Sequence, residues 1–347
     1  MALKITSWNL DWADTLVDGT TVPAWMAVPH PERKDLIYQT LQEINPDIFC
    51  MIEGPRGEKR LSTFCRDVLR DEWVPVLLGD GTGTKDGKYE TDGWQWIWFL
   101  VKPELAERCR LQDVSVWVDK SGPLKWKVHL WGQLYTTADH WHYRHPQVLV
   151  HTFEDGTEME LIGVHLKSMR PSKAFSRDAG GNINQDYLNE ALTNRIKVAT
   201  EARNVRSYIS RRFADGAGTD PAMIVLGDCN DDQGQDYFEE NYMFFSVVSN
   251  LEGNILKSPE FFYHALFDND PALNWTVMFA DEVSGKAAED NKLLLDHILY
   301  SQPLRGGPFP LHAKPQAGRV EHDAWNAYSA GAPYPASDHR PVTITLT

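Results

Sequence analysis

Carboxylate, carboxamide and imidazole side chains recur along this chain where predicted strands begin or end. Asp228 and Asn230 follow one apolar strand, Asp296 lies in another, and His339 stands just before the last. Carboxylate and amide oxygens are the ligands that hard divalent cations prefer, and a histidine can hold or move a proton near neutral pH. The set therefore predicts a metal-assisted site that cleaves phosphate esters.

The local geometry of these residues leaves two interpretations open. Asp228 and Asn230 lie two apart, so both side chains would share one side if the strand continued through them, but Asp and Asn are equally typical of turns. Asp338 and His339 would point in opposite directions in a regular strand, so we expect them in a loop before Val342, facing one pocket. Taken alone, His339 is more typical of a surface loop.

Apolar spacing alternates predicted strands with amphipathic helices. The strands are expected at 3–10, 47–52, 74–78, 94–101, 114–119, 126–130, 148–153, 158–165, 222–226, 293–300 and 342–346, and the helices from Pro31 to before Asn45, at 58–70 and at 186–212. Because no internal repeat or linker interrupts the pattern, we expect residues 1–347 to form a single domain.

Composition limits the partners and the compartment. The 347 residues are 42% hydrophobic and carry a formal net charge of -15, so a polyanion would have to be held locally against long-range repulsion. No apolar run is long enough to span a bilayer, and four cysteines without a CxxC pair favour free thiols in a reducing compartment. We expect a soluble, cytoplasmic monomer without a protein partner. A secreted protein whose signal peptide had been removed would show the same sequence features.

Six short motifs, in order and spread over essentially the whole chain, resemble those of the endonuclease/exonuclease/phosphatase (DNase I-like) superfamily. They are Trp8-Asn9, Glu53, Gly163-Val164-His165-Leu166-Lys167-Ser168, Gly227-Asp228-Cys229-Asn230, Asp296-His297 and Ser337-Asp338-His339. The resemblance implies the α/β class, as a four-layer α/β sandwich in which helices flank two central mixed β-sheets. It also implies that the site lies at one end of those sheets.

The resemblance further implies a divalent cation, Mg²⁺ or Mn²⁺, and the residues around it. Glu53 would bind the metal, with Asn9 and Asp338 close enough to help. Asp228 would orient or deprotonate the attacking water, and Asn230 would steady that water and the phosphate.

The remaining roles that the resemblance implies concern the phosphate. His339, held by Asp296, would stabilise the phosphorane-like transition state, and His165 would contact the phosphate or assist the leaving group. Arg144, in a segment similar to the family's Arg-x-Pro element, and Lys167 are candidates for the substrate phosphate. The second partner of His165 is left open between Glu90, Asp92 and Gln95.

Two segments bear on the substrate, each with a plain alternative. The basic residues Lys167, Arg170, Lys173 and Arg177 would line the route to the site or belong to a solvated loop. The aromatic and histidine residues of 126–145 would stack on bases, receive a lipid group or bind a further metal, or they would simply pack in a hairpin.

Three functions follow from these motifs. The first is a divalent-metal-dependent phosphodiesterase or nuclease that cleaves the nucleic-acid backbone by in-line attack of an activated water. The alternative is a phosphatase or phospholipase-like hydrolase of the sphingomyelinase or inositol-phosphate type, which acts on a small or lipid phosphate. The third is an inactive binding module on the same fold, which the presence of Glu53, Asp228, Asp296 and His339 disfavours.

Overall fold

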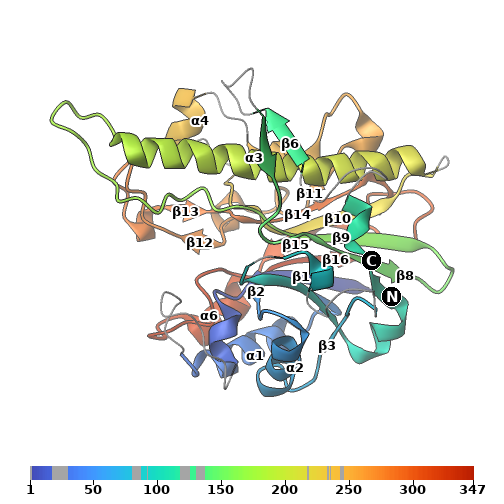
Figure 1. Cartoon of the computed structure of the whole chain (residues 1–347). Helices are drawn as coiled ribbons and strands as arrows, with labels where there is room; N and C mark the ends of the chain where they lie inside the picture. Colours follow the sequence, from blue (N-terminus) through green and yellow to red (C-terminus); the bar gives the residue numbers. More distant parts are fainter. Residues whose placement is uncertain are drawn as a thin grey trace.

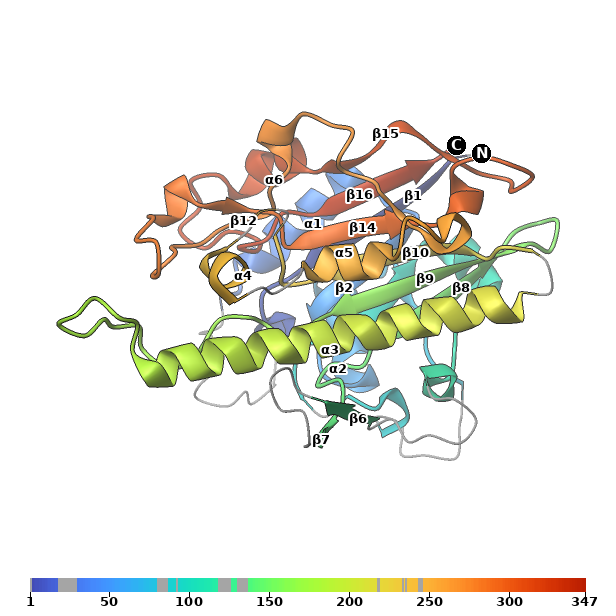
Figure 2. The same ribbon diagram turned by 90° about the horizontal axis from the view of Figure 1, so that it is seen from above.

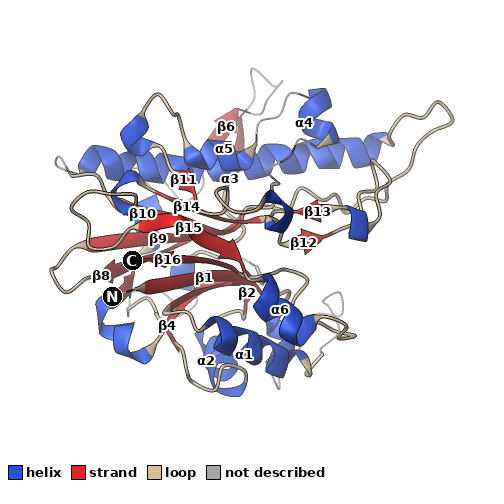
Figure 3. Cartoon of the chain, turned by 180° about the vertical axis from the view of Figure 1, so that it is seen from behind, coloured by secondary structure: helices blue, strands red, loops and turns tan. Residues whose placement is uncertain are grey.

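Two six-stranded mixed sheets stack face to face, and helices cover both outer faces (Figures 1 and 3). The computed structural model describes residues 2–17, 30–79, 87–91, 93–117, 126–129, 137–216, 219–232, 234, 236–242 and 246–347. The four-layer sandwich that the motifs predict is confirmed. Because both faces of each sheet are covered, its central strands consist of nearly continuous buried residues.

The first sheet contains both the beginning and the end of the chain. Its order is β15 (Ala313–Val320), β16 (Val342–Leu346), β1 (Leu3–Asn9), β2 (Ile48–Gly54), β4 (Trp96–Val101) and β3 (Val74–Pro75). β1 pairs with β2 in parallel and with β16 antiparallel. Helices α1 (Arg33–Ile44), α2 (Glu58–Asp67) and α6 (His322–Ser329) lie on its outer side (Figure 1).

The second sheet is built from the middle of the chain. Its order is β11 (Tyr263–His264), β14 (Asp296–Tyr300), β10 (Ala222–Asp228), β9 (Glu158–His165), β8 (Gln147–Thr152) and β5 (Cys109–Leu111). The long helix α3 (Gln185–Asp215) runs along its outer face beside α5 (Val247–Glu252), as Figure 2 shows. The remaining described α-helix is α4 (Tyr237–Tyr242), and the remaining described strands form two pairs, β6 (Trp126–His129) with β7 (Thr137–His140) and β12 (Val277–Met278) with β13 (Lys292–Leu293).

Local chemistry explains where the predicted helices begin and end. α1 ends at Asn45, which adopts a left-handed φ of 48° and donates its N–H to the Leu41 carbonyl, directly before Pro46. α3 begins after Asn184, whose side chain accepts from the N–H groups of Asp186 and Tyr187. No helix in the described part of the chain is both long and apolar enough to cross a membrane.

Three strand predictions are corrected. Val114–Trp117 is a short 3₁₀ turn, in which Asp113 Oδ1 accepts the Ser115 N–H, and residues 118–119 lie outside the described ranges. The strand predicted at 74–78 is only two residues long and contains Pro75, which cannot donate to the ladder. The run 293–300 is divided between β13 and β14.

The segment 126–145 forms the predicted hairpin, β6 with β7, and then returns to the core; its Trp131 and Tyr135 lie outside the described residues. His142 and His145 are buried against the Trp117 ring. His142 Nε2 lies 3.0 Å from Asn204 Oδ1, and His145 Nδ1 lies 3.0 Å from the Pro146 carbonyl oxygen. These contacts support packing and not a further metal site.

The buried histidine His145 predicts acid lability. Burial, and then the neighbouring His142, lowers its pKa from 6.5 to about 3, so the folded protein keeps it neutral while the unfolded chain protonates it below about pH 6.5. Stability is therefore lost as the pH falls from 6.5 towards 3, by about 2 kcal/mol at pH 5 from this group alone. Denaturant unfolding at pH 8 and pH 5 checks this. The difference in the free energy of unfolding between wild type and His145→Phe should be smaller at pH 5 than at pH 8. An equal difference at both pH values would contradict the lowered pKa of His145.

Candidate active site

The ends of neighbouring strands bring the predicted residues of both sheets to one place. In the second sheet, the register of β9, β10 and β14 sets His165 beside Asp228 and Asp228 beside Asp296. In the first sheet, β1 ends at Asn9, and β2 runs parallel to it and carries Glu53 near its own end. Each sheet therefore contributes part of the cluster.

Asn9 joins two carboxylates that belong to different sheets. Its Nδ2 donates to Asp228 Oδ2 at 3.0 Å and to Glu53 Oε1 at 3.3 Å. The other Glu53 oxygen, Oε2, accepts from Gln95 Nε2 at 2.6 Å. Asn9 Oδ1 accepts the Asp11 N–H at 3.0 Å, so the Asn9 nitrogen holds carboxylates while its oxygen is engaged by the backbone.

A tight turn follows Asp228 and decides how Asn230 lies. Gly227 has a φ of 136°, and a Cβ there would lie 2.0 Å from the Val164 carbonyl oxygen, so only glycine fits. Asp228 Oδ1 accepts the Asn230 N–H at 2.8 Å, and Asn230 takes a left-handed φ of 53°. Asn230 Nδ2 then donates to the Leu166 carbonyl at 3.0 Å. The shared side expected from a continuous strand is wrong, because the strand ends at Asp228.

His339 is held on three sides. Its Nδ1 donates to Asp296 Oδ2 at 2.7 Å, its N–H donates to Ser337 Oγ at 3.0 Å, and its carbonyl accepts from Trp8 Nε1 at 2.9 Å. Its exposed fraction is only 6%, so the surface-loop interpretation is wrong. The neighbouring Asp338, by contrast, is exposed and contacts Ser337 Oγ at 3.4 Å.

The two histidines of the cluster differ in charge. Burial opposes protonation of His339, but the Asp296 carboxylate outweighs it and raises the pKa of His339 well above its ordinary value. Burial, and then the charge of Arg144, lowers the pKa of His165 well below its ordinary value. At neutral pH the site therefore contains one imidazolium and one neutral imidazole.

Arg144 has hydrogen-bonding capacity that the described residues do not use. Its Nε and Nη1 atoms are buried and make no hydrogen bond to any described residue. The positive charge of Arg144 opposes the rise in the pKa of Glu53 and lowers the pKa of His165, in each case more than any other charged residue does. Lys167, by contrast, donates its Nζ to the Ser168 carbonyl at 2.8 Å.

His165 occupies the centre of the cluster. Its Nε2 lies 3.6 Å from Asp228 Oδ2 and 3.7 Å from Glu53 Oε1, while its Nδ1 has no hydrogen-bond partner among the described residues. Of the partners left open, Gln95 binds Glu53 instead, Glu90 is exposed, and Asp92 lies outside the described ranges.

Three carboxylates of the cluster have a raised pKa. Burial raises the pKa of Glu53 and raises that of Asp228 to about 7; burial and then the charge of Asp338 raise that of Asp11 to about 7. Among the described residues, no group of three or more His, Cys, Asp or Glu side chains is placed to hold a metal ion by itself. Mg²⁺ commonly takes only one or two protein carboxylates together with waters and substrate phosphate, so this oxygen donor set fits an open Mg²⁺ site.

Two residues of the site were missed from the sequence. Arg33, 4% exposed, donates to the carbonyls of Leu10 and Asp11 at 2.6 and 3.0 Å and to that of Ala336 at 2.9 Å. It thereby ties the loop after β1 to the loop before β16. Asp11 belongs to the first of these loops and lies 3.8 Å from the Arg33 guanidinium.

The basic residues beyond Lys167 do not join the cluster. Arg170, Lys173 and Arg177 are exposed, and Arg177 donates to the carbonyls of Gly181 and Val283. These contacts favour the solvated-loop interpretation of this segment.

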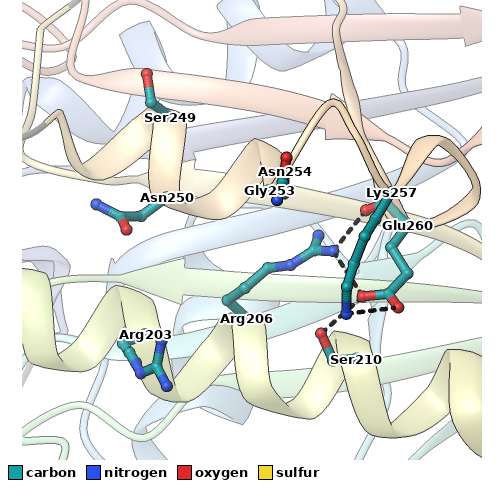
Figure 4. A pocket seen from close by; sticks show the side chains of 9 residues that line it. All are labelled: Arg203, Arg206, Ser210, Ser249, Asn250, Gly253, Asn254, Lys257 and Glu260. Atoms are coloured by element: carbon teal, nitrogen blue, oxygen red, sulfur yellow. Dashed lines mark hydrogen bonds and ion pairs between the residues drawn. The ribbon is translucent and has the colours of Figure 1, made fainter.

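A separate hollow of about 440 Å³ lies between α3 and the segment around α5 (Figure 4). Its central cation, Arg206, is already bound by the carbonyls of Leu251, Glu252 and Glu260 and by the Glu260 carboxylate. Lys257 and Ser210 contact the same carboxylate. None of the residues predicted to act in chemistry lines this hollow.

Comparison with known proteins connects this geometry to a fold. No protein-family model and no curated protein matches the chain. Similar solved structures include a humanized D. rerio TDP2 (TM-score 0.52, 14% identity, covering 100% of this chain and 99% of that chain) and a truncated Caenorhabditis elegans TDP2 (0.51, 14%, 100% and 98%). An endonuclease/exonuclease/phosphatase family protein from Leptotrichia buccalis gives 0.48 and 13% identity, with 99% of both chains covered. The chain therefore shares the fold of these TDP2 structures, a sandwich of two mixed sheets flanked by helices as its sequence motifs predict.

Proposed function

We propose that this protein is a divalent-metal-dependent phosphodiesterase that cleaves the nucleic-acid backbone by in-line attack of water. The observation that carries the proposal is the buried Asp296–His339 pair, 2.7 Å apart, in the same cluster as Asp228 and Glu53. Because each sheet supplies part of this cluster, we propose the whole chain as one catalytic domain.

Asp228 and its neighbours act on the attacking water. With a pKa of about 7, the Asp228 carboxylate can accept a proton from water near neutral pH, and the Asn9 amide and the Asn230 N–H fix its orientation. Glu53, with Asp338 nearby, would hold Mg²⁺ or Mn²⁺. When bound, the cation polarises the phosphate and neutralises its non-bridging oxygens.

The cationic residues act on the phosphate. The His339 imidazolium, oriented by Asp296, stabilises the negative charge that develops on the phosphoryl oxygens. Neutral His165 offers one N–H to the phosphate or the leaving oxygen. The unused Nε and Nη1 donors of Arg144 suit a second phosphate oxygen, with Lys167 nearby.

Two observations support nucleic acid as the substrate over a small or lipid phosphate. One structure with the same fold, a D. rerio TDP2 (TM-score 0.50, 14% identity), is complexed with single strand DNA product. In addition, the Phe279 ring lies 6.2 Å from the His339 ring, and base stacking is a common use of aromatic rings beside a phosphate site.

Plasmid nicking tests the proposal. Purified protein with Mg²⁺ or Mn²⁺ should nick supercoiled plasmid and hydrolyse bis(p-nitrophenyl) phosphate, and both activities should disappear with EDTA and in Asp228→Asn. Diester turnover without cleavage of plasmid or of single-stranded oligonucleotide would favour the small- or lipid-phosphate alternative. The absence of activity on plasmid, oligonucleotide and bis(p-nitrophenyl) phosphate would contradict the proposal.

A further inference from the structure

Two aromatic residues, Trp94 and Tyr143, each directly precede a residue of the proposed site in the chain. Trp94 is half-buried and precedes Gln95, whose Nε2 donates to Glu53 Oε2 at 2.6 Å. Tyr143 is 44% exposed and precedes Arg144, whose buried donors have no partner among the described residues. The Tyr143 ring lies 5.7 Å from the Arg144 guanidinium carbon, and thus beside the phosphate position that the proposed function assigns to Arg144.

The two ring-bearing segments pack against each other. A Cβ on Gly93 would lie 2.1 Å from Tyr143 Cζ, so the tip of the tyrosine occupies the space that any other residue would fill. The His145 N–H also donates to Thr91 Oγ1 at 3.1 Å. These contacts hold Tyr143 against the backbone that precedes Trp94.

Arginines accompany both rings. The guanidinium carbons of Arg56 and Arg60 lie 5.4 and 4.8 Å from the Trp94 ring centroid, and that of Arg144 lies 5.7 Å from the Tyr143 ring centroid. Arg56 is exposed and follows shortly after Glu53 in the chain. The buried Asp14 carboxylate, 3.4 Å from Arg60 Nη1, partly neutralises Arg60, while Arg56 and Arg144 add positive charge beside the aromatic faces of a chain of net charge -15.

We propose that Arg56, Arg60, Trp94, Tyr143 and Arg144 form a subsite that stacks unpaired bases next to the scissile phosphate. We call this set the rim; the inference rests on the proposed function and specifies single-stranded nucleic acid as its substrate. Rings with adjacent cations bind single strands because every unpaired base offers a free face and its phosphates need only a few positive charges. A duplex keeps its bases stacked and meets the repulsion of the acidic surface.

Oligonucleotide binding tests the rim directly. A labelled single strand, the matching duplex, and the same single strand with tetrahydrofuran abasic residues are titrated by fluorescence anisotropy, with turnover blocked by Asp228→Asn. Trp94→Ala and Tyr143→Ala in this background should each weaken single-strand binding about 10-fold to 100-fold, and Trp94→Phe and Tyr143→Phe should restore most of it. The abasic strand should bind weakly to all variants, and the duplex should bind worse than the single strand.

The matched control is Tyr263→Ala. Tyr263 also stacks on an arginine, Arg305, at 4.2 Å, but it pairs with Tyr300 at the opposite end of β14 from Asp296. Its loss should leave single-strand binding unchanged. Equal affinity of the Ala variants and their parent, or equal weakening on the abasic strand, would overturn the rim assignment.

Failure of the rim and failure of the proposed function give different results. If the otherwise wild-type protein cleaves single strands and the two Ala variants cleave them equally well, the rim assignment alone is wrong. If the wild-type protein hydrolyses bis(p-nitrophenyl) phosphate but neither binds nor cleaves any oligonucleotide, both the proposed action on nucleic acid and the rim assignment are wrong.

Discussion

Replacing Asp228 with Asn is expected to lower kcat for phosphodiester cleavage about 10³-fold, the usual loss when a general base is removed. The substitution keeps the size of the side chain but removes the group that accepts the proton from water. Folding should not suffer, because burial raises the pKa of Asp228 to about 7, and relief of that buried charge exceeds the roughly 1 kcal/mol of one lost hydrogen bond. Kinetics with saturating Mg²⁺ and denaturant unfolding of the metal-free protein at pH 8 measure the two effects.

Asp231 provides the control for this substitution. It is a buried carboxylate three residues further on, and its Oδ2 accepts from the N–H groups of Val247 and Val248 and from Ser246 Oγ at the start of α5. Asp231→Asn should therefore leave kcat nearly unchanged, because these donors and not the attacking water occupy its carboxylate. A comparable loss of kcat in both variants would mean that Asp228 acts through the structure and not on the water.

The different effects on kcat reflect where each carboxylate points. Asp228 and Glu53 are carboxylates whose pKa is raised by burial, so the fold bears an electrostatic cost where the chemistry is proposed. Burial raises the pKa of Asp231 as well, but its Oδ2 is occupied by donors at the start of α5. A raised pKa therefore marks a functional carboxylate only where its oxygens face the proposed site.

Much of the site could be predicted because it lies where strands begin or end. The apolar runs leading to Asn9, His165 and Asp228 are long and clearly bounded, and their β strands end at those residues. The sheet register then places His165, Asp228 and Asp296 side by side. Strand ends can be recognised in a single sequence, whereas the pairing of distant strands cannot. That pairing was predicted only because the order of the motifs resembles that of a known superfamily.

The contacts that depend on turns and tertiary packing could not be predicted. Asp11, Glu53, Gln95 and Asn230 all adopt positive φ, a conformation that nothing in their residue types demands. The sequence pattern predicts that Arg33 is a solvated cation at the start of a helix, but its guanidinium donates to the carbonyls of residues 10, 11 and 336. The strand β15 was not predicted from the sequence for a similar reason. It contains Pro315 and a register shift between Ala313 and Gly318, and these interrupt the alternation of apolar and polar residues that would indicate a strand.

The Asp296–His339 pair is expected to behave as one unit in a double-mutant cycle. His339→Gln removes the imidazolium and should lower kcat about 10²-fold to 10³-fold with little change in KM, because its charge acts on the transition state. Asp296→Asn keeps the ring but removes the carboxylate that orients and charges it, and should lower kcat about 10²-fold.

The double variant decides whether the two residues share one role. It should lose about as much kcat as His339→Gln alone, because Asp296 has no role left once the imidazolium is gone. His151→Gln removes a buried histidine from β8, where it pairs with Met159 far along β9 from His165, and should leave kcat unchanged. Multiplicative losses in the double variant would separate the two residues and assign Asp296 a function of its own, with its unpartnered Oδ1 as the atom to examine among the described residues.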